Sequence, residues 1–233
     1  MPYYGYGFYD PTMIILIPAI LFTMYAQFKV SSTTNRFFRV RSASGYTGKD
    51  VAERILMSND IRDVRVDVVR GTLTDHYDPR RKVLRLSEDV FYGTSVTAVA
   101  VAAHECGHAI QHARGYAPLE IRGAIVPVVN FASSISWVLI FAGFLFSGGN
   151  MLLRIGIVMF SLTVIFQLIT LPVEINASRR ALVQLRSLSI VGDREARDSR
   201  KVLTAAALTY VAAAMTAILQ LLRLLLIFSN RDD

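Results

Sequence analysis

Long apolar runs alternate with polar segments along this chain, and the alternation predicts most of its architecture. Four runs approach the roughly 20 apolar residues that a membrane-crossing helix needs. These runs cover residues 11–28, 124–147, 151–173 and 202–228. The charged residues within them are Arg154 and Arg223, each near an end of its run, where a long side chain reaches the polar interface. The pattern therefore predicts four transmembrane helices, the second and third joined by a tight turn at Gly148–Asn150.

The first polar segment, residues 29–123, has the pattern of a small mixed domain. Thr47 with Asp50 three residues later predicts a capped helix over about Gly48–Met57. Alternating apolar residues predict strands at Val64–Val69 and Val83–Ser87. The turn-forming residues between these strands favour pairing them as a hairpin.

A second helix is expected at the end of this segment, from about Val96 to Arg114, with Thr94 or Ser95 as its cap. From Glu174 onward, the third apolar run continues into a polar helix, with a kink expected at Pro172. The whole chain then divides into a tail with the first helix (1–28), the mixed segment (29–123), a transmembrane hairpin (124–173), a polar helical segment (174–201) and the last helix with its tail (202–233).

Composition and charge agree with a membrane protein. The hydrophobic set makes up 53% of the 233 residues, charged residues 18%, and the mean hydropathy is +0.40. This excludes a disordered chain, and one cysteine, Cys106, excludes a disulfide-stabilised scaffold. The net charge of +7 comes from the polar segments, since residues 29–123 hold 15 and residues 174–201 hold 7 of the 25 Lys and Arg.

Positive loops mark the cytoplasmic side of a membrane. The distribution of charge therefore predicts a multi-pass protein of the bacterial inner (plasma) membrane, with both polar segments in the cytoplasm and both termini outside. The aromatic-rich start, residues 1–10, suits a membrane interface. Basic residues do not cluster with aromatic ones, so nucleic acid is not expected as a partner.

The expected helix from Val96 contains the sequence His104-Glu105-Cys106-Gly107-His108. Residues four apart lie on one face of a helix, so the two histidines can bind one zinc ion. Glu105 is placed to reach a water at that ion and to act as general base and then acid. Cys106 points away from this face and is expected to pack in the interior.

Catalytic zinc needs a third protein ligand and an open position. Glu174 is the preferred ligand, because two membrane crossings after His108 return it to the same side, and a carboxylate at the end of a span is costly unless it is paired or bound. The alternative is an interfacial carboxylate paired with Arg179 or Arg180. Further residues remain open as hydrogen-bonding partners of the ligands or as substrate contacts: Ser178, Asn176, His112, His76, Tyr77, Arg179 and Arg180.

The segments His104–Gln111 and Pro172–Ala181 resemble the bacterial membrane (neutral) zinc metallopeptidase family, a gluzincin-like pattern of HExxH with a later glutamate. A more distant likeness is to the HtpX-type and CAAX prenyl proteases. The resemblance covers most of the chain. It implies an integral membrane α-helical bundle of about four transmembrane helices carrying a small zincin-like α+β catalytic domain. In this comparison an aspartate usually follows four residues after the glutamate, whereas this chain has Ser178 there, which leaves Asn176 and Ser178 both possible as the orienting residue.

Together these features predict a membrane-embedded zinc metalloendopeptidase with one Zn²⁺, acting on protein or peptide substrates at the cytoplasmic membrane surface and in contact with the lipid bilayer. In related zincins an edge strand aligns the substrate, and Val83–Ser87 is the expected strand. The alternatives are a site-2-type intramembrane protease and a catalytically idle zinc-binding adaptor. The sequence contains no Asp-Gly element of the first kind, and Glu105 argues against the second.

Overall fold

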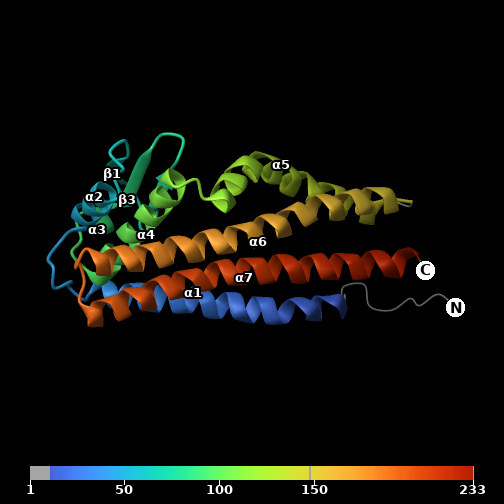
Figure 1. Ribbon diagram of the computed structural model, residues 1–233. Helices are drawn as coiled ribbons and strands as arrows, with labels where there is room; N and C mark the ends of the chain where they lie inside the picture. Colours follow the sequence, from blue (N-terminus) through green and yellow to red (C-terminus); the bar gives the residue numbers. More distant parts are fainter. Residues whose placement is uncertain (1–10, 147, 233) are drawn as a thin grey trace. The chain divides into compact units, whose positions relative to one another are not determined.

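A computed structural model describes residues 11–146 and 148–232 of the chain (Figure 1). The expected interfacial tail, residues 1–10, lies outside this description. In chain order the elements are η1 (Pro11–Leu16), α1 (Ile17–Phe38), α2 (Gly48–Ser58), β1 (Arg65–Val69), β2 (His76–Asp78), β3 (Val83–Ser87), α3 (Glu88–Phe91), α4 (Val96–Ala113), α5 (Ala117–Leu145), α6 (Asn150–Ser187) and α7 (Asp193–Asp232).

Four helices are long and apolar enough to cross a membrane, which confirms the prediction of an integral membrane protein. All four extend beyond the apolar runs: α1 continues ten residues past Phe28, and α7 begins nine residues before Val202. Large apolar side chains remain exposed on these helices, such as Phe28 and Phe141, both at 71%. Such exposure is unfavourable in water and suits contact with lipid tails.

The chain forms two compact units. The first contains residues up to Met24, Ile125–Gln167 and Ala212 onward, which are the apolar parts of the four long helices. Within it, α5 and α6 pack closely at glycines. A Cβ added at Gly156 would lie 2.7 Å from Ile140 Cγ1 and 3.0 Å from the Ser136 carbonyl oxygen, so this approach requires glycine. Small residues at helix crossings are typical of membrane bundles.

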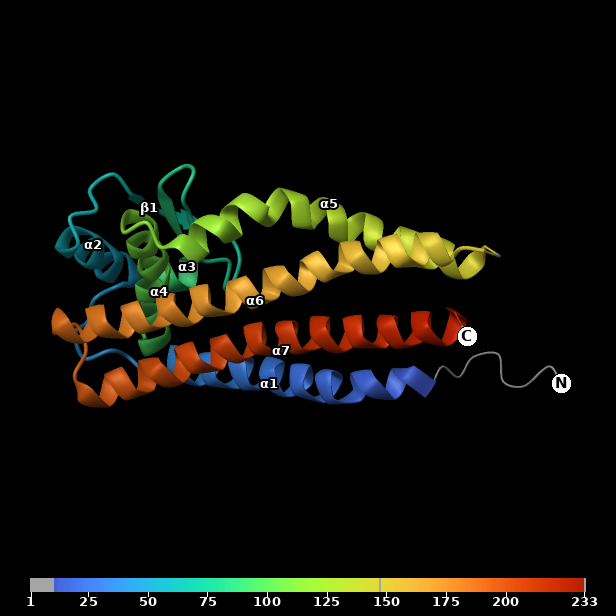
Figure 2. The same cartoon turned by 45° about the vertical axis from the view of Figure 1, so that its right-hand side comes forward.

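The second unit contains residues Tyr25–Ala124 and Leu168–Val211 and holds the mixed α/β segment. Figures 1 and 2 show α2, α3 and α4 gathered beside the strands. Helix α2 starts as predicted, with a capping box in which Thr47 and Asp50 satisfy each other's backbone N–H groups. Ser95 caps α4 by accepting a hydrogen bond from the Ala98 N–H at 3.1 Å.

The sheet differs from the predicted hairpin. Its order is β1-β3-β2, with β1 parallel to β3 and β2 antiparallel to β3. The hairpin of Val64–Val69 with Val83–Ser87 is therefore wrong. The short strand β2, formed by the residues expected to turn, pairs with β3 instead, so that β3 lies in the middle of the sheet.

Candidate metal centre

Helix α4 holds the HExxH residues in the interior of the second unit. Its first two turns are built from small apolar residues, and Ala98, Val99, Ala100, Ala102 and Ala103 are all fully buried. Cys106 is buried as predicted, its Sγ 3.7 Å from the Ala52 carbonyl oxygen. Burial raises the pKa of the Cys106 thiol, so this side chain is an unreactive packing residue. The opposite face of α4 carries His104 and His108.

Helix α6 brings Glu174 to the two histidines. The Glu174 Oε2 atom lies 3.2 Å from His104 Nε2 and 3.4 Å from His108 Nε2. One ligand atom from each of the three residues lies within 4.8 Å of the others, the arrangement of a three-ligand metal site. The structure therefore brings together the three residues that the sequence singled out.

The second ring nitrogen of each histidine has its own polar partner. His104 Nδ1 lies 3.1 Å from Ser178 Oγ, and His108 Nδ1 lies 3.0 Å from Gln111 Oε1. The Gln111 amide is fixed, because its Nε2 donates to the Val173 carbonyl oxygen at 2.8 Å and to Asn176 Oδ1 at 3.0 Å. The Gln111 Oε1 atom facing His108 is therefore a hydrogen-bond acceptor, so His108 Nδ1 carries the proton. The lone pair of His108 Nε2 is then available to a metal ion on the side of Glu174.

Arg122, on α5, binds the other carboxylate oxygen of Glu174. The Arg122 Nη1 to Glu174 Oε1 distance is 2.9 Å, and the Glu174 side chain is only 3% exposed. The expected alternative of an ion pair with Arg179 or Arg180 is not the pairing seen among the described residues. Arg122 offsets part of the cost of burying this carboxylate and orients it with Oε2 toward the histidines.

The electrostatics of the site favour a cation. Burial alone would lower the pKa of His108, but the neighbouring Glu174 and Glu105 carboxylates outweigh it and hold that pKa above its usual value. The same negative potential that favours a proton at this position favours a metal ion.

Gly107 allows α4 to approach α6 closely enough for this geometry. A Cβ at this position would lie 2.4 Å from the Ala177 carbonyl oxygen, well inside van der Waals contact. Any other residue would move the two histidines away from Glu174, which lies one helical turn before Ala177. The close contact of α4 with the backbone of α6 therefore explains the glycine between Cys106 and His108.

A cavity of about 210 Å³ opens beside the cluster. His104, Glu105 and Glu174 line it together with Asp75 and, from α7, Tyr210. Glu105 is 8% exposed, so its carboxylate lies in the wall of this cavity beside the ligand triad. Asp75 accepts hydrogen bonds from the Ser87 N–H and Oγ, and burial raises the pKa of Asp75.

Several residues that the sequence left open lie away from the triad. His112 and Tyr77 bind each other, with Tyr77 Oη 2.8 Å from His112 Nδ1. The exposed His76 contacts the Thr74 carbonyl oxygen and Arg85.

The remaining open residues fall into a supporting network and the surface. Arg180 donates to Asn176 Oδ1 at 2.7 Å and so supports Gln111 indirectly. Arg179 is exposed. Ser178 and Asn176 thus both take part in orienting the histidines, one directly and one through Gln111.

Sequence reasoning missed Arg122, Tyr210 and the role of Gln111. Arg122 precedes the second apolar run by two residues. A basic residue at the end of a membrane-crossing run was a candidate partner for Glu174, which lies at the end of the third run. Tyr210 is the one tyrosine in the alanine-rich run 202–228. An amide three residues after His108 lies on the same helical face, so the spacing itself indicated Gln111.

The expected substrate-aligning strand is not an edge strand. β3, Val83–Ser87, pairs along its length with β1 and at Val83–Arg85 with β2, so most of it has no free edge for a peptide. The bent segment before β2 contributes Leu73 and Asp75 to the cavity wall, whereas no residue of β3 lines it.

The comparison with known proteins agrees with this geometry. A family model described as a putative neutral zinc metallopeptidase matches residues 12–229. The chain belongs to this zinc metallopeptidase family. Among its relatives, the Putative membrane protease YugP of Bacillus subtilis (strain 168) is 49% identical over 221 residues, which are 95% of this chain and 98% of that protein. No solved structure matches the chain.

Membership of a zinc metallopeptidase family implies zinc, and the residues present fit this ion. Two imidazole nitrogens and one carboxylate oxygen form the donor set of a catalytic zinc site. Each histidine has its outer nitrogen held by a hydrogen-bond partner, as metal-binding histidines almost always do. The open cavity beside the triad leaves room for a water and a substrate.

Replacement of Ser178 by alanine tests the outer contacts of the metal centre. Because Ser178 Oγ orients His104, we expect Ser178→Ala to weaken zinc binding by about 10- to 100-fold. Competition with a fluorescent zinc chelator measures the change. The matched control is Ser187→Ala, near the end of the same helix and bonded only to the Gln184 carbonyl oxygen. Equal affinities for the two variants would contradict the role given to Ser178.

Proposed function

We propose that this protein is a membrane-embedded zinc metalloendopeptidase that hydrolyses peptide bonds with Glu105 as general base. The observation that carries the proposal is the convergence of His104 Nε2, His108 Nε2 and Glu174 Oε2 at the wall of an open cavity that Glu105 also lines. Family membership and a relative named as a membrane protease support the reaction class.

Each residue of the site has a separate chemical role in the proposed reaction. Zinc held by the triad would lower the pKa of a water to about 7 and polarise the substrate carbonyl. The Glu105 carboxylate accepts the proton of the attacking water and later donates it to the departing amine, so no net proton is consumed. Arg122 pairs with the Glu174 carboxylate and fixes its direction.

Tyr210 is the residue that we assign to the substrate carbonyl. Its side chain lines the cavity together with Glu105 and Glu174. A phenolic O–H in this place can donate to the oxygen on which negative charge develops. Of the residues that the sequence left open as substrate contacts, Tyr77, His76, Arg179 and Arg180 do not line this cavity.

The main alternative is a membrane adaptor with a structural zinc. A structural site is closed by four protein ligands, whereas the described residues supply three beside a cavity. Purified protein in detergent, loaded with zinc, distinguishes the two. We expect it to cut unfolded casein, with internal cuts identified by mass spectrometry and abolished by 1,10-phenanthroline. Zinc-loaded protein that leaves casein and a mixed peptide library intact would favour the adaptor.

We further propose that the site faces the cytoplasm, as the charge of the polar segments indicates. Cys106 is buried and unreactive, so the native chain provides a silent background for cysteine labelling. We expect a membrane-impermeant maleimide to label Asn230→Cys in intact cells and Asp60→Cys only after lysis. The reverse pattern would place the site outside, and labelling of the native chain would contradict the packing of Cys106.

A further inference from the structure

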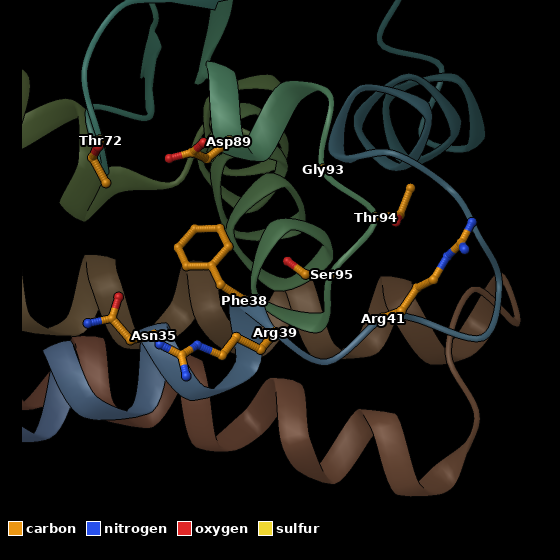
Figure 3. A pocket seen from close by; sticks show the side chains of 9 residues that line it. All are labelled: Asn35, Phe38, Arg39, Arg41, Thr72, Asp89, Gly93, Thr94 and Ser95. Atoms are coloured by element: carbon orange, nitrogen blue, oxygen red, sulfur yellow. The ribbon is translucent and has the colours of Figure 1, made fainter.

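A second cavity, of about 590 Å³, lies in the same unit as the metal centre. Its size falls within the range of about 300–1,000 Å³ typical of ligand-binding clefts. One wall comes from the end of α1 and the residues after it, and the other from residues 72, 89 and 93–95 (Figure 3). The lining residues are Asn35, Phe38, Arg39, Arg41, Thr72, Asp89, Gly93, Thr94 and Ser95.

This cavity borders the metal-centre cavity at two places along the chain. On α1, Thr34 lines the first cavity and Asn35 the second. In the segment before β2, Leu73 lines the first and Thr72 the second. Consecutive residues in two separate segments thus place the second cavity next to the metal-centre cavity, within reach of a peptide lying across the metal centre.

Arg39 is the cation available to a ligand there. Among the described residues no carboxylate lies within ion-pair distance of Arg39 or Arg41, and both side chains belong to exposed residues. Figure 3 shows the two running in opposite directions, Arg39 toward Asn35 and Arg41 away from it. Phe38 also lines the cavity, where its ring offers an apolar surface to the stem of a side chain.

We propose that this cavity is a specificity subsite that binds an acidic side chain of the peptide substrate through Arg39. A guanidinium group matches a carboxylate with two parallel hydrogen bonds, which suits recognition of Asp or Glu. The inference rests on the proposed function, because it assigns the cavity to the same substrate that Glu105 acts on.

The spacing of the lining residues along α1 gives the scale of the separation between the two cavities. Thr34 and Val30 line the metal-centre cavity, and Phe38 lies four and eight residues further along α1. At 1.5 Å per residue these steps are about 6 and 12 Å. An extended peptide covers about 3.3 Å per residue, so the subsite reads a position about two to four residues from the scissile bond.

The position of the cavity favours a peptide over a lipid headgroup. The apolar run of α1 ends at Phe28, and Asn35 and Phe38 lie seven and ten residues beyond it. This is about 10–15 Å along the helix, whereas each headgroup layer is about 5–7 Å thick.

Peptide binding tests the subsite separately from catalysis. Zinc-loaded Glu105→Gln protein in detergent is mixed with fluorescent peptides built on one casein sequence, carrying Glu, Gln or Lys two to four residues from the chosen bond on either side. We expect the Glu peptide to bind about three- to tenfold more tightly than the Lys peptide at one of these positions, measured by fluorescence anisotropy. Adding Arg39→Glu should reverse this preference.

The matched control is Arg36→Glu, which makes the same change of charge one turn earlier on α1 but does not line the cavity. We expect it to keep the preference for Glu. No preference at any position, or an equal change in both variants, would overturn the subsite. Weaker binding of fluorescent phosphatidic acid in Arg39→Glu, without a change in peptide preference, would assign the cavity to lipid and overturn it too. Peptides that bind with the expected preference but are not cut by the native protein would overturn the proposed function alone.

Discussion

Replacing Glu105 by glutamine is expected to lower peptide cleavage by about 10²- to 10⁴-fold and to leave zinc bound. The amide has nearly the volume of the carboxylate but cannot accept the proton of the attacking water. Glu105 lies in the cavity wall and is not one of the three convergent ligands, so its loss should not open the triad. Initial rates on one casein-derived peptide and the zinc content per chain measure the two effects.

The pH profile separates a lost base from a distorted site. A variant without the base should lose the acidic limb of the kcat/KM profile that the native protein shows, because that limb reports protonation of the free enzyme's base. Glu120→Gln, an exposed glutamate in the first turn of α5, is the control and should behave as the native protein. Full cleavage by Glu105→Gln would overturn the proposed mechanism.

Replacing Glu174 by alanine is expected to have the largest effect on metal binding. The substitution removes one of three ligand atoms and leaves Arg122 without the carboxylate it binds. We expect zinc affinity to fall by more than the roughly 10- to 100-fold that loss of an outer contact costs. Cleavage should be lost with the zinc, and added zinc should restore it only in part.

Two further variants guard against simple unfolding. Glu174→Gln keeps the volume of the side chain and should also lose zinc, because a neutral amide is a weaker ligand. Arg122→Ala keeps the ligand and should weaken zinc binding by only about 10- to 100-fold. Zinc bound with undiminished affinity by Glu174→Ala would mean a different third ligand, for which Asp75 in the same cavity is the first residue to test.

The sequence predicts the parts of this protein in which a local pattern decides the structure. The four long helices follow from apolar runs whose length fits a bilayer, and the start of α2 follows from the capping box at Thr47. The ligand triad was found because HExxH spacing is a property of one helix turn, and because counting membrane crossings places Glu174 on the side of His108.

The sequence fails where a contact depends on the approach of segments far apart in the chain. Local alternation identifies β1 and β3 as strands but carries no information on how they pair. They can lie parallel because the chain between them reverses direction in β2, which pairs with the other side of β3. Arg122 and Glu174 are 52 residues apart, and no local rule pairs them. Tyr210 is similar: its place beside the cavity depends on how α7 packs in the second unit.

The third ligand lies in the same unbroken helix that crosses the membrane, since α6 runs from Asn150 to Ser187 without interruption. During synthesis, a ribosome that has reached Val173 has made both histidines and Glu105 but no complete site. The metal site is therefore incomplete until the hairpin of α5 and α6 has been translated. A fragment that ends before the hairpin would hold Glu105 and two of the three ligands, and under the proposed function it would remain inert toward the unfolded chains around it.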